Sequence, residues 1–485
     1  MDTSVFRNTL ENLRKVWQGI AGAGRAPVEV PQVKAFLPRG DAERVAEMMR
    51  SCLEARGGEV SARMRAAGLG QMYLTLNDKG RRRFLEILAR DFAVRDEALE
   101  EAMESLRAAG TPESRLAAEE GLREVLVPPR LRLLKQFNVL RRGVKFLVDL
   151  RADLLQHVDD PAMKSLDADL KRLLATWFDV GFLELRHITW DSPAALLEKL
   201  IAYEAVHQIH SWQDLRNRLE SDRRCYAFFH PGMPEEPLIF VEVALVSGIS
   251  DSVQALLDET IPEMDPSRAD TAIFYSISNT QKGLRGISFG HFLIKRVADD
   301  LSHEFPNIRT FATLSPIPGF NRWLEKQLAE EGGDELVEEL REGIAAAAGR
   351  LVVPSLLQEV LAVEGWHADE TVSESLRPQL ERLCARYLHA TRPDGRLLDP
   401  VERFHLGNGA LIERLNWLGD SSAKGMEQSC GLMVNYLYRL DEVEKNHERY
   451  VAEGRIAASQ QIAELLEPPP QEGGKSRFGK LMPGK

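Results

Sequence analysis

The spacing of hydrophobic and polar positions divides this chain into a helical first part and a mixed second part. In residues 1–178, apolar positions recur three and four residues apart, for example in 81–92 and 131–155, as they do on one face of an α-helix. Thr111-Pro112 and Asp160-Pro161 are typical helix starts, with proline at the first helical position. The sequence shows no repeat of fixed period, so a solenoid is not predicted. Residues 1–178 are therefore interpreted as a helical bundle used for packing or assembly.

The pattern changes near Gly181. Residues 182–190 alternate between apolar and polar positions, as a half-buried strand does. Further strands are predicted at 224–229 and 237–246, and helices at 191–206, 214–220 and 250–259. This order of helices and neighbouring strands is typical of a mixed α/β sheet.

The stretch 271–320 contains the group of predicted elements around which the second part of the chain is organised. A β-rich run at 271–278 is followed by a loop that contains glycines, and a second β-like run lies at 310–314. Between them lies a helical pattern whose apolar positions would share one face: Phe289, Leu293, Val297 and Leu301. The sequence therefore predicts a strand, a loop, a helix and a second strand, with Ser315 directly after that strand.

The remaining residues are predicted to be mainly helical. Residues 321–390 have a helical pattern, and the acidic run 330–342 favours a solvated helical insertion at about 321–395. Asp399, Pro400 and Glu402 form a capping-box pattern that begins a short helix carrying His405. A helix is predicted at 410–417, a strand at 432–440, a final helix at 441–463 and a disordered Pro/Gly/Lys-rich tail at 467–485. The predicted fold class is α+β and multidomain, with an all-α bundle at 1–178 followed by a mixed α/β domain at 179–466.

Composition limits the function classes and the compartment. The 485 residues carry a formal net charge of −12, which argues against general nucleic-acid binding. The four cysteines are scattered without metal-ligand spacing, and His207 and His210 have no evident third ligand, so no metal site is predicted. We find no membrane-spanning run, no apolar signal core near residue 1 and no peroxisomal ending, and we expect a reducing, cytoplasmic setting.

The loop at 285–291 has the features of an anion-binding turn. Gly286 and Gly290 allow close approach of the backbone to a bulky anion, because glycine has no Cβ. Free N–H groups at the start of the following helix favour negative charge, and Arg285 adds a fork suited to phosphate. From spacing alone, an ordinary strand-to-helix connection explains the same glycines equally well.

Short sequence motifs add a resemblance to a known family. Arg285-Gly286-Ile287-Ser288-Phe289-Gly290 before an amphipathic helix resembles the coenzyme A pyrophosphate loop of the GNAT acyltransferase superfamily, with Ser288 in place of a usual glycine. The segments FYSIS, GHFLIKRV, LSPIPGF, FHLGNGA and SCGLMVNY occur in this order between about residues 180 and 460. This set resembles the malonyl-CoA decarboxylase family, whose GNAT-like domain follows a helical domain.

The resemblance implies an activity and a set of site residues. It implies decarboxylation of malonyl-CoA to acetyl-CoA and carbon dioxide through an enolate, a reaction of fatty acid metabolism, by a homo-oligomer that is a dimer or tetramer. It implies no metal and no separate cofactor, because coenzyme A is part of the substrate. The implied catalytic residues are Ser315 and His405, the coenzyme A loop comprises Arg285, Gly286, Ile287, Ser288, Phe289, Gly290 and His291, and Tyr436, Tyr438 and Asn408 are secondary candidates.

Other interpretations of these residues remain open at the level of sequence. From spacing alone, Ser315 fits an ordinary Ser-Pro turn, and His405 fits a core histidine beside Phe404. At the C-terminal end of its short helix, His405 would be favoured in the protonated form. Two other functions are compatible with the same fold: an acyltransferase that passes an acyl group to an amine, and a non-catalytic acyl-CoA sensor.

Overall fold

The protein has an α+β fold in which contacts divide the chain into two compact units. The computed structural model describes residues 30–54, 58–138, 140, 142–287, 293–329, 341–351 and 357–467. The first unit comprises Met1–Glu184, Phe228–Leu238 and Asn279–Gly290, and the second comprises Leu185–Ala227, Ile239–Ser278 and His291–Lys485. The predicted fold class is confirmed, whereas the predicted domain boundaries at 178, 321–395 and 466 stay predictions.

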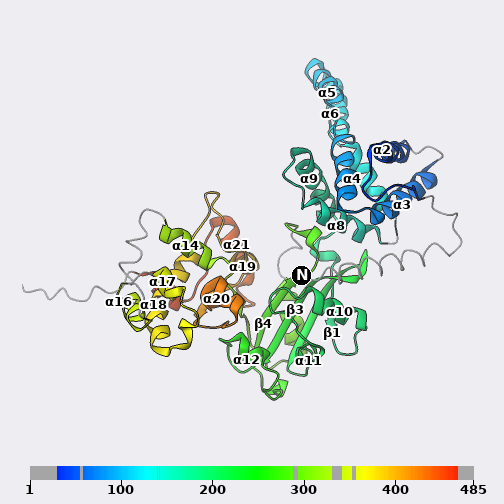
Figure 1. Cartoon of the computed structure of the whole chain (residues 1–485). Coiled ribbons are helices and arrows are strands. Elements are labelled where there is room, and N and C mark those ends of the chain that lie inside the picture. The colour runs from blue at the N-terminus through cyan, green and yellow to red at the C-terminus, as the bar shows by residue number, and fades with distance from the viewer. Residues whose placement is uncertain are drawn as a thin grey trace, which may run out of the picture. The chain divides into compact units, whose positions relative to one another are not determined.

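Helices make up most of the first unit (Figure 1). They are α2 (Arg39–Leu53), α3 (Glu59–Thr75), α4 (Asp78–Arg90), α5 (Asp96–Ala108), α6 (Pro112–Val125), α7 (Pro129–Phe137), α8 (Gly143–Leu154) and α9 (Pro161–Ala175). The predicted helix starts are confirmed, since Thr111 accepts a hydrogen bond from the Ser114 amide and Asp160 accepts one from the Ala162 amide. The buried rings of Phe84 and Phe146 both pack against the buried ring of Tyr73 in this unit.

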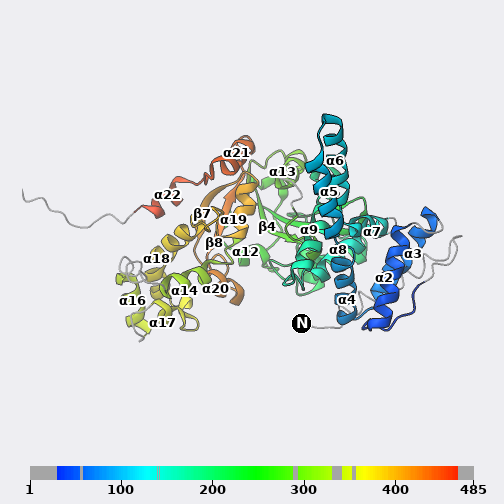
Figure 2. The same ribbon diagram turned by 90° about the horizontal axis from the view of Figure 1, so that it is seen from above.

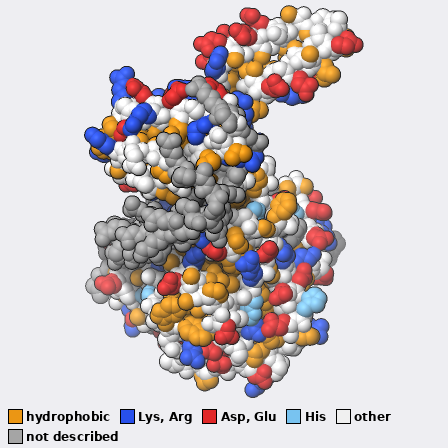
Figure 3. Space-filling view, turned by 90° about the vertical axis from the view of Figure 1, so that its right-hand side faces the viewer, with side chains coloured by type: hydrophobic (Ala, Val, Ile, Leu, Met, Phe, Trp, Pro, Cys, Tyr) orange, Lys and Arg blue, Asp and Glu red, His pale blue; other side chains and the backbone are white. Residues whose placement is uncertain are grey.

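Helices α5 and α6 form a hairpin that leaves most of its own surface uncovered. Neither helix has a buried residue, and the hairpin extends beyond the other helices of its unit (Figures 1 and 2). Met103, Leu116, Leu126 and Val127 are exposed on the hairpin or at its end, and Figure 3 shows hydrophobic side chains along it. The hairpin therefore presents apolar surface to its surroundings.

An eight-stranded mixed sheet is the second main feature. The strands are β1 (Glu184–Ile188), β2 (Arg223–His230), β3 (Met233–Val246), β4 (Thr271–Asn279), β5 (Thr310–Thr313), β6 (Ser315–Pro316), β7 (Leu411–Asn416) and β8 (Met433–Leu437). Their order is β1-β2-β3-β4-β5-β8-β6, and β7 also pairs with β8. Strands β4 and β5 are parallel, whereas β8 is antiparallel to β5, β6 and β7. This is the strand–loop–helix–strand arrangement that the sequence predicts for 271–314.

The remaining α-helices of the described residues belong to the second unit (Figure 2). They are α10 (Ala194–Tyr203), α11 (Trp212–Asn217), α12 (Val253–Leu257), α13 (Leu293–Glu304), α14 (Phe320–Ala329), α16 (Arg341–Leu351), α17 (Leu357–Leu361), α18 (Glu370–Leu388), α19 (Pro400–Gly407), α20 (Ala423–Ser429), α21 (Val443–Glu453) and α22 (Gln460–Leu466). One core cluster joins Ile273, Ala312 and Met433 from β4, β5 and β8. Within the described ranges, no helix is long and apolar enough to span a bilayer.

Three predictions about local structure are wrong or incomplete. Residues 410–417 were predicted as a helix, but 411–416 form β7, in which the register with β8 shifts between Ile412 and Arg414. The register shift means that β7 contains one residue more than β8 at this point. The additional residue breaks the period of two along β7, so the apolar spacing of β7 resembles that of a helix. The predicted helix at 441–463 is two helices, because Gly454 at φ 65° ends α21. Helix α18 buries Leu376, Leu380 and other side chains, so the predicted insertion is packed rather than merely solvated.

Candidate active site

The structure places Ser315 and His405 in direct contact, although they are 90 residues apart in sequence. The distance from Ser315 Oγ to His405 Nε2 is 3.1 Å, and the exposed fractions are 5% for Ser315 and 3% for His405. Ser315 lies in β6, where it pairs with Val434 of β8, and His405 lies in α19. A buried hydroxyl within hydrogen-bond distance of an imidazole is an arrangement that can move a proton.

Helix α19 positions His405 through both of its ends. The carboxylate of Asp399 accepts hydrogen bonds from the amides of Val401 and Glu402 at 2.8 and 2.9 Å, and Pro400 occupies the first helical position. At the other end, the Asn408 side chain donates to the Phe404 carbonyl at 2.7 Å. Asn408 therefore closes the helix that carries His405, and its predicted secondary role at the site stays a prediction.

Helix α21 holds the turn that follows α19. The Nδ1 atom of His447 lies 2.7 Å from the Gly407 carbonyl oxygen, and Asn446 donates to the Gly409 carbonyl at 3.4 Å. Gly409 has a φ of 82°, a conformation that favours glycine. The C-terminal end of the His405 helix is thus fixed by contacts with a second helix.

Thr313 is a neighbour of Ser315 that the sequence interpretation missed. The Ser315 hydroxyl donates to Thr313 Oγ1 at 2.8 Å, and the Tyr436 amide donates to the same oxygen at 3.1 Å. Residues two apart in an extended strand point to the same face, and that spacing would have identified Thr313. Thr313 fixes the direction of the Ser315 hydroxyl.

Tyr436 and Tyr438, which the sequence suggested as secondary candidates, both contact His405. The Tyr436 ring stacks on the imidazole with ring centroids 4.5 Å apart, and the Tyr438 hydroxyl lies 2.8 Å from His405 Nδ1. Burial raises the pKa of Tyr438 well above its usual value, so this hydroxyl keeps its proton. Among the described residues, the Tyr438 hydroxyl has His405 Nδ1 as its hydrogen-bond partner. We therefore assign Tyr438 as the donor and His405 Nδ1 as the acceptor.

This assignment fixes the state of His405. With Nδ1 accepting from Tyr438, Nε2 carries the hydrogen and donates to Ser315 Oγ. Burial lowers the pKa of His405 to about 3, so the free protein holds a neutral imidazole at neutral pH. The expectation of a protonated imidazole at the helix C-terminus is wrong, because the cost of burying the charge outweighs the favourable helix dipole.

Glu402 introduces a second ionisable group close to His405 along the chain. It lies one helical turn before His405, is fully buried, and neither carboxylate oxygen has a hydrogen-bond partner among the described residues. The reciprocal contact of the predicted capping box is therefore absent there, although Asp399 does cap the helix. Burial, reinforced by the nearby Asp399 carboxylate, raises the pKa of Glu402 well above its usual value, so this carboxyl group is expected to be protonated.

The predicted coenzyme A loop begins in the first unit, and only its beginning is described. Arg285, Gly286 and Ile287 are described, whereas Ser288, Phe289, Gly290 and His291 lie outside the described residues. Gly286 has a φ of 75°, which supports the predicted need for glycine at this position. The Lys171 ammonium nitrogen would lie 3.4 Å from a Cβ placed on Gly286, so it brings a cation close to the loop.

Arg151 supports the same loop and was also missed by the sequence interpretation. Its guanidinium donates to the carbonyl oxygens of Gly283 and Arg285 at 2.7 and 3.0 Å and pairs with Asp167 at 2.7 Å. The Arg151 side chain is buried. A buried arginine that binds two loop carbonyls holds the loop in one conformation.

Comparisons with known proteins agree on one family. Residues 181–476 match the family model described as the malonyl-CoA decarboxylase C-terminal domain, and residues 92–178 match the one described as its N-terminal domain. The chain is 43% identical over 363 residues to "Malonyl-CoA decarboxylase, mitochondrial" of Mus musculus, covering 72% of this chain and 74% of that protein. These matches confirm the resemblance that the motifs predicted.

Solved structures give the same result. The crystal structure of malonyl-CoA decarboxylase from Rhodopseudomonas palustris has a TM-score of 0.79 and 41% identity, covering 87% of this chain and 99% of that one. The structure of the enzyme of the same name from Agrobacterium vitis has a TM-score of 0.76 and 39% identity, with 87% and 99% of the two chains covered. The similarity therefore extends over most of the chain.

Proposed function

The chain belongs to the malonyl-CoA decarboxylase family, and from this premise we propose that Ser315 and His405 carry out the decarboxylation of malonyl-CoA. Membership makes the chain a decarboxylase, an enzyme of the carboxy-lyase class. The observation that supports the roles of the two residues is the buried contact of 3.1 Å between Ser315 Oγ and His405 Nε2. The products are acetyl-CoA and carbon dioxide.

The reaction breaks one carbon–carbon bond and forms one carbon–hydrogen bond. The bond between the malonyl carboxylate and the α-carbon breaks, and its electron pair moves into the thioester carbonyl to give an enolate. The α-carbon then takes one proton. Because the thioester carbonyl accepts the electron pair, the proposed reaction requires neither a metal nor an organic cofactor. The enzyme must hold the carboxylate out of the carbonyl plane, stabilise the developing oxyanion and deliver the proton.

Ser315 and His405 can supply that proton through a chain of hydroxyl and imidazole groups. The Ser315 hydroxyl gives its hydrogen to the α-carbon while His405 Nε2 returns a hydrogen to Ser315 Oγ. Solvent restores the hydrogen of His405 Nε2 after the products leave, while Tyr438 keeps its own hydrogen and holds Nδ1 at 2.8 Å. Tyr438 acts through His405 and is a positioning residue in this scheme. Thr313 keeps Ser315 oriented until substrate binds.

The loop at 285–291 would hold the coenzyme A part of the substrate. Arg285 and Lys171 provide positive charge near Gly286, whose missing side chain leaves the backbone accessible to a phosphate. Arg151 holds the start of this loop in place by donating hydrogen bonds to two backbone carbonyl oxygens, those of Gly283 and Arg285. The predicted backbone contacts at Ile287, Ser288, Phe289, Gly290 and His291 are part of the same proposal.

The exposed apolar surface of the α5–α6 hairpin supports assembly into a homo-oligomer. Leu116 and Leu126 lie exposed on or beside helices that bury none of their own residues. Exposed apolar surface of this kind is typical of a protein interface. We expect a dimer or tetramer by sedimentation at micromolar concentration, and a monomer there would contradict the proposal.

A reducing compartment is the setting we propose for this chain. All four cysteines, Cys52, Cys225, Cys384 and Cys430, are buried and free. The mouse relative is named mitochondrial, whereas the sequence of this chain predicts the cytoplasm. Fractionation of cells that make the protein would separate the two locations.

Turnover in deuterated water tests the proposed chemistry. Wild-type protein incubated with malonyl-CoA in deuterium oxide should give acetyl-CoA that carries one solvent deuterium in its methyl group, detected by mass spectrometry. General acid–base groups typically contribute about 10²- to 10⁴-fold to rate, so Ser315→Ala and His405→Asn should lose turnover by that factor while they still bind acetyl-CoA. Ser302→Ala and His389→Asn, which alter the same residue types in α13 and next to α18, should keep wild-type rates.

Other outcomes distinguish the alternatives. Unchanged malonyl-CoA with tight binding would favour an acyl-CoA sensor, or a transferase if an amine panel then accepts an acetyl group from acetyl-CoA. Decarboxylation that survives both Ser315→Ala and His405→Asn would show that the reaction uses other groups. In that case the family activity would stand, and the proposed catalytic roles of Ser315 and His405 would be wrong.

A further inference from the structure

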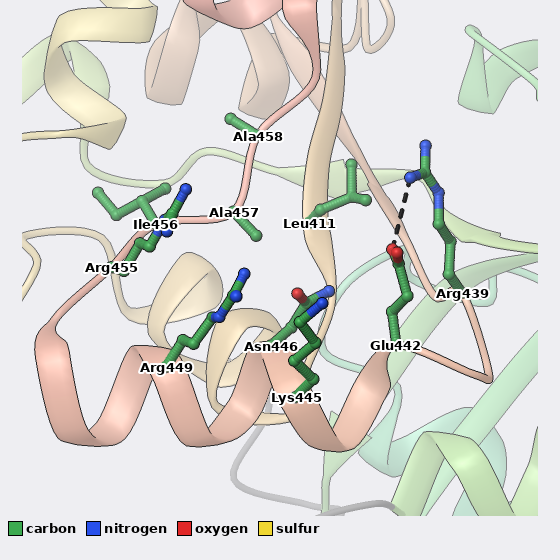
Figure 4. Close-up of a pocket in the computed structure, with 10 residues that line it drawn as sticks. All are labelled: Leu411, Arg439, Glu442, Lys445, Asn446, Arg449, Arg455, Ile456, Ala457 and Ala458. Carbon is green, nitrogen blue, oxygen red and sulfur yellow. Dashed lines mark hydrogen bonds and ion pairs between the residues drawn. The ribbon is translucent and has the colours of Figure 1, made fainter.

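A basic pocket lies in the second unit, on one side of helix α21 (Figure 4). Its volume is about 250 Å³, and its lining contains four cations and one acid. The cations are Arg439, Lys445, Arg449 and Arg455, and the acid is Glu442. The chain as a whole has a net charge of −12, so this concentration of positive charge runs against its overall composition.

Three of the four cations have no acidic partner in the described part of the chain. Arg439 lies 3.4 Å from Glu442, the contact drawn as a dashed line in Figure 4. The side chains of Lys445, Arg449 and Arg455 make no ion pair with the residues that the structure describes. Lys445 and Arg449 are four residues apart on one helical face, where like charges destabilise a helix. An anion in the pocket would remove this repulsion.

The chain turns back on itself to complete the pocket. Gly454 has a φ of 65° and ends α21, and the amide of Arg455 then donates to the Arg449 carbonyl at 3.3 Å. The following segment is held against β7, because the Ile412 amide donates to the Ala457 carbonyl at 2.9 Å. The walls of the pocket are therefore built from a helix, a strand and a connecting segment held by backbone hydrogen bonds. Figure 4 shows Arg449 and Arg455 on the same side of the pocket.

From these features we propose that the basic pocket binds a phosphate monoester. Three guanidinium groups and one ammonium group around a small hollow match the doubly charged oxygens of such a group, since the guanidinium fork binds phosphate through two parallel hydrogen bonds. The helix C-terminus explains a single nearby cation, but four cations around one hollow exceed what the helix dipole requires. The hollow is smaller than the roughly 300–1,000 Å³ of pockets that enclose whole drug-sized ligands, so it takes the phosphate end of a larger molecule.

Two molecules can present this chemistry. One is coenzyme A itself, whose ribose carries a phosphate monoester, and this source rests on the proposed function. The other is a separate phosphorylated metabolite that binds independently of the substrate. Both require the same cations, so the same variants test the pocket and a competition experiment identifies the source.

Binding of adenosine 3′-monophosphate is the direct test, with adenosine as the control without phosphate. The probe is titrated by calorimetry into the full-length protein in the absence of coenzyme A. Because a hydrogen bond to a charged group contributes about 1.5–3 kcal/mol, Arg449→Gln combined with Arg455→Gln should weaken probe binding by at least about 10- to 100-fold. Arg377→Gln combined with Arg396→Gln removes the same charge elsewhere on the second unit and should leave binding unchanged.

The Arg449 and Arg455 substitutions leave the Ser315–His405 contact intact. Arg439 is excluded because it directly follows Tyr438, whose hydroxyl contacts His405. Repeating the titration of adenosine 3′-monophosphate on protein saturated with coenzyme A then separates the two possible sources of the phosphate. Loss of the probe signal assigns the pocket to the ribose phosphate of coenzyme A, and persistence assigns it to a separate phosphorylated ligand.

Two results would overturn the proposal: no phosphate-dependent binding by the wild type, or equal binding by the wild type and the Arg449/Arg455 variant. The titration involves no turnover, so its outcome is independent of whether Ser315 and His405 perform the decarboxylation. A protein that carries Ser315→Ala should still bind the probe as the wild type does.

Discussion

The turn between α19 and β7 offers a quantitative test of how His405 is held. A Cβ placed on Gly409 would lie 2.1 Å from the Val443 carbonyl oxygen and 2.7 Å from its carbonyl carbon. Both atoms belong to the backbone of α21, so neither can move aside as the end of a flexible side chain can. Gly409→Ala must therefore displace α21 from the turn that ends the His405 helix.

Two costs add in this substitution. The φ of 82° is left-handed, which costs an L-residue about 1–2 kcal/mol, and forcing an extra methyl into packed structure typically costs about 1–3 kcal/mol. We expect Gly409→Ala to lower the free energy of unfolding by about 2–5 kcal/mol, measured by urea denaturation. Turnover should also fall, because the same displacement moves the His447 contact that holds Gly407.

Two glycine controls separate the costs. Gly395 has a similar φ of 79° but no atom within 4 Å of its Cβ position, so Gly395→Ala should show the conformational cost of about 1–2 kcal/mol alone. Gly407 lies at the end of α19 with a free Cβ position, and Gly407→Ala should be neutral or stabilising by up to about 1 kcal/mol. If Gly409→Ala costs no more than Gly395→Ala, the contact with Val443 is not rigid and the reasoning is refuted.

Three further predictions concern buried polar groups. Tyr438→Phe removes the hydrogen bond to His405 Nδ1, so kcat should fall by about 5- to 150-fold with little change in KM, and an unchanged kcat would contradict its positioning role. The raised pKa of Glu402 means that folding stability falls as pH rises above the pKa that this carboxyl group has in the unfolded chain. Glu402→Gln should therefore gain Tm over wild type progressively as pH rises from about 4, and a constant difference would refute this. Arg218→Met leaves buried Glu242 unpaired and should lower the free energy of unfolding by about 3–5 kcal/mol, measured by denaturation. Adding Glu242→Gln should restore part of this loss, and strictly additive effects of the two substitutions would exclude their coupling.

Local signals in the sequence were sufficient for much of the fold. Proline and capping residues at Thr111, Asp160 and Asp399 predicted helix starts that the structure confirms, because these interactions involve residues only two or three apart. Strands β2 to β5 were likewise predicted from apolar runs and alternation. Strand β7 was missed because its identity depends on pairing with β8 and on a bulge, which are properties of residues distant in sequence.

The site divides in the same way. The family resemblance proposed Ser315 and His405 together, and the structure brings them into contact. Spacing could not show that Tyr438 would contact His405, or that Glu402 would be buried without a partner instead of completing a capping box. Both facts depend on how α19 packs in the second unit, and the resulting pKa shifts depend on burial, which the local sequence does not specify.

Strand β8 explains how these distant segments form one site. It is the strand that pairs with β5, β6 and β7, so it brings Ser315 opposite Val434 and Ile412 opposite Tyr436. Asn435 reinforces this junction, because its side chain donates to the Thr313 carbonyl and accepts from Arg414 and Asn416 of β7. Tyr436 lies in β8 and Tyr438 directly follows the last residue of that strand, and both contact His405. A single short strand therefore sets the position of the serine through pairing, while Tyr436 in this strand and Tyr438 just after it contact the histidine that α19 carries.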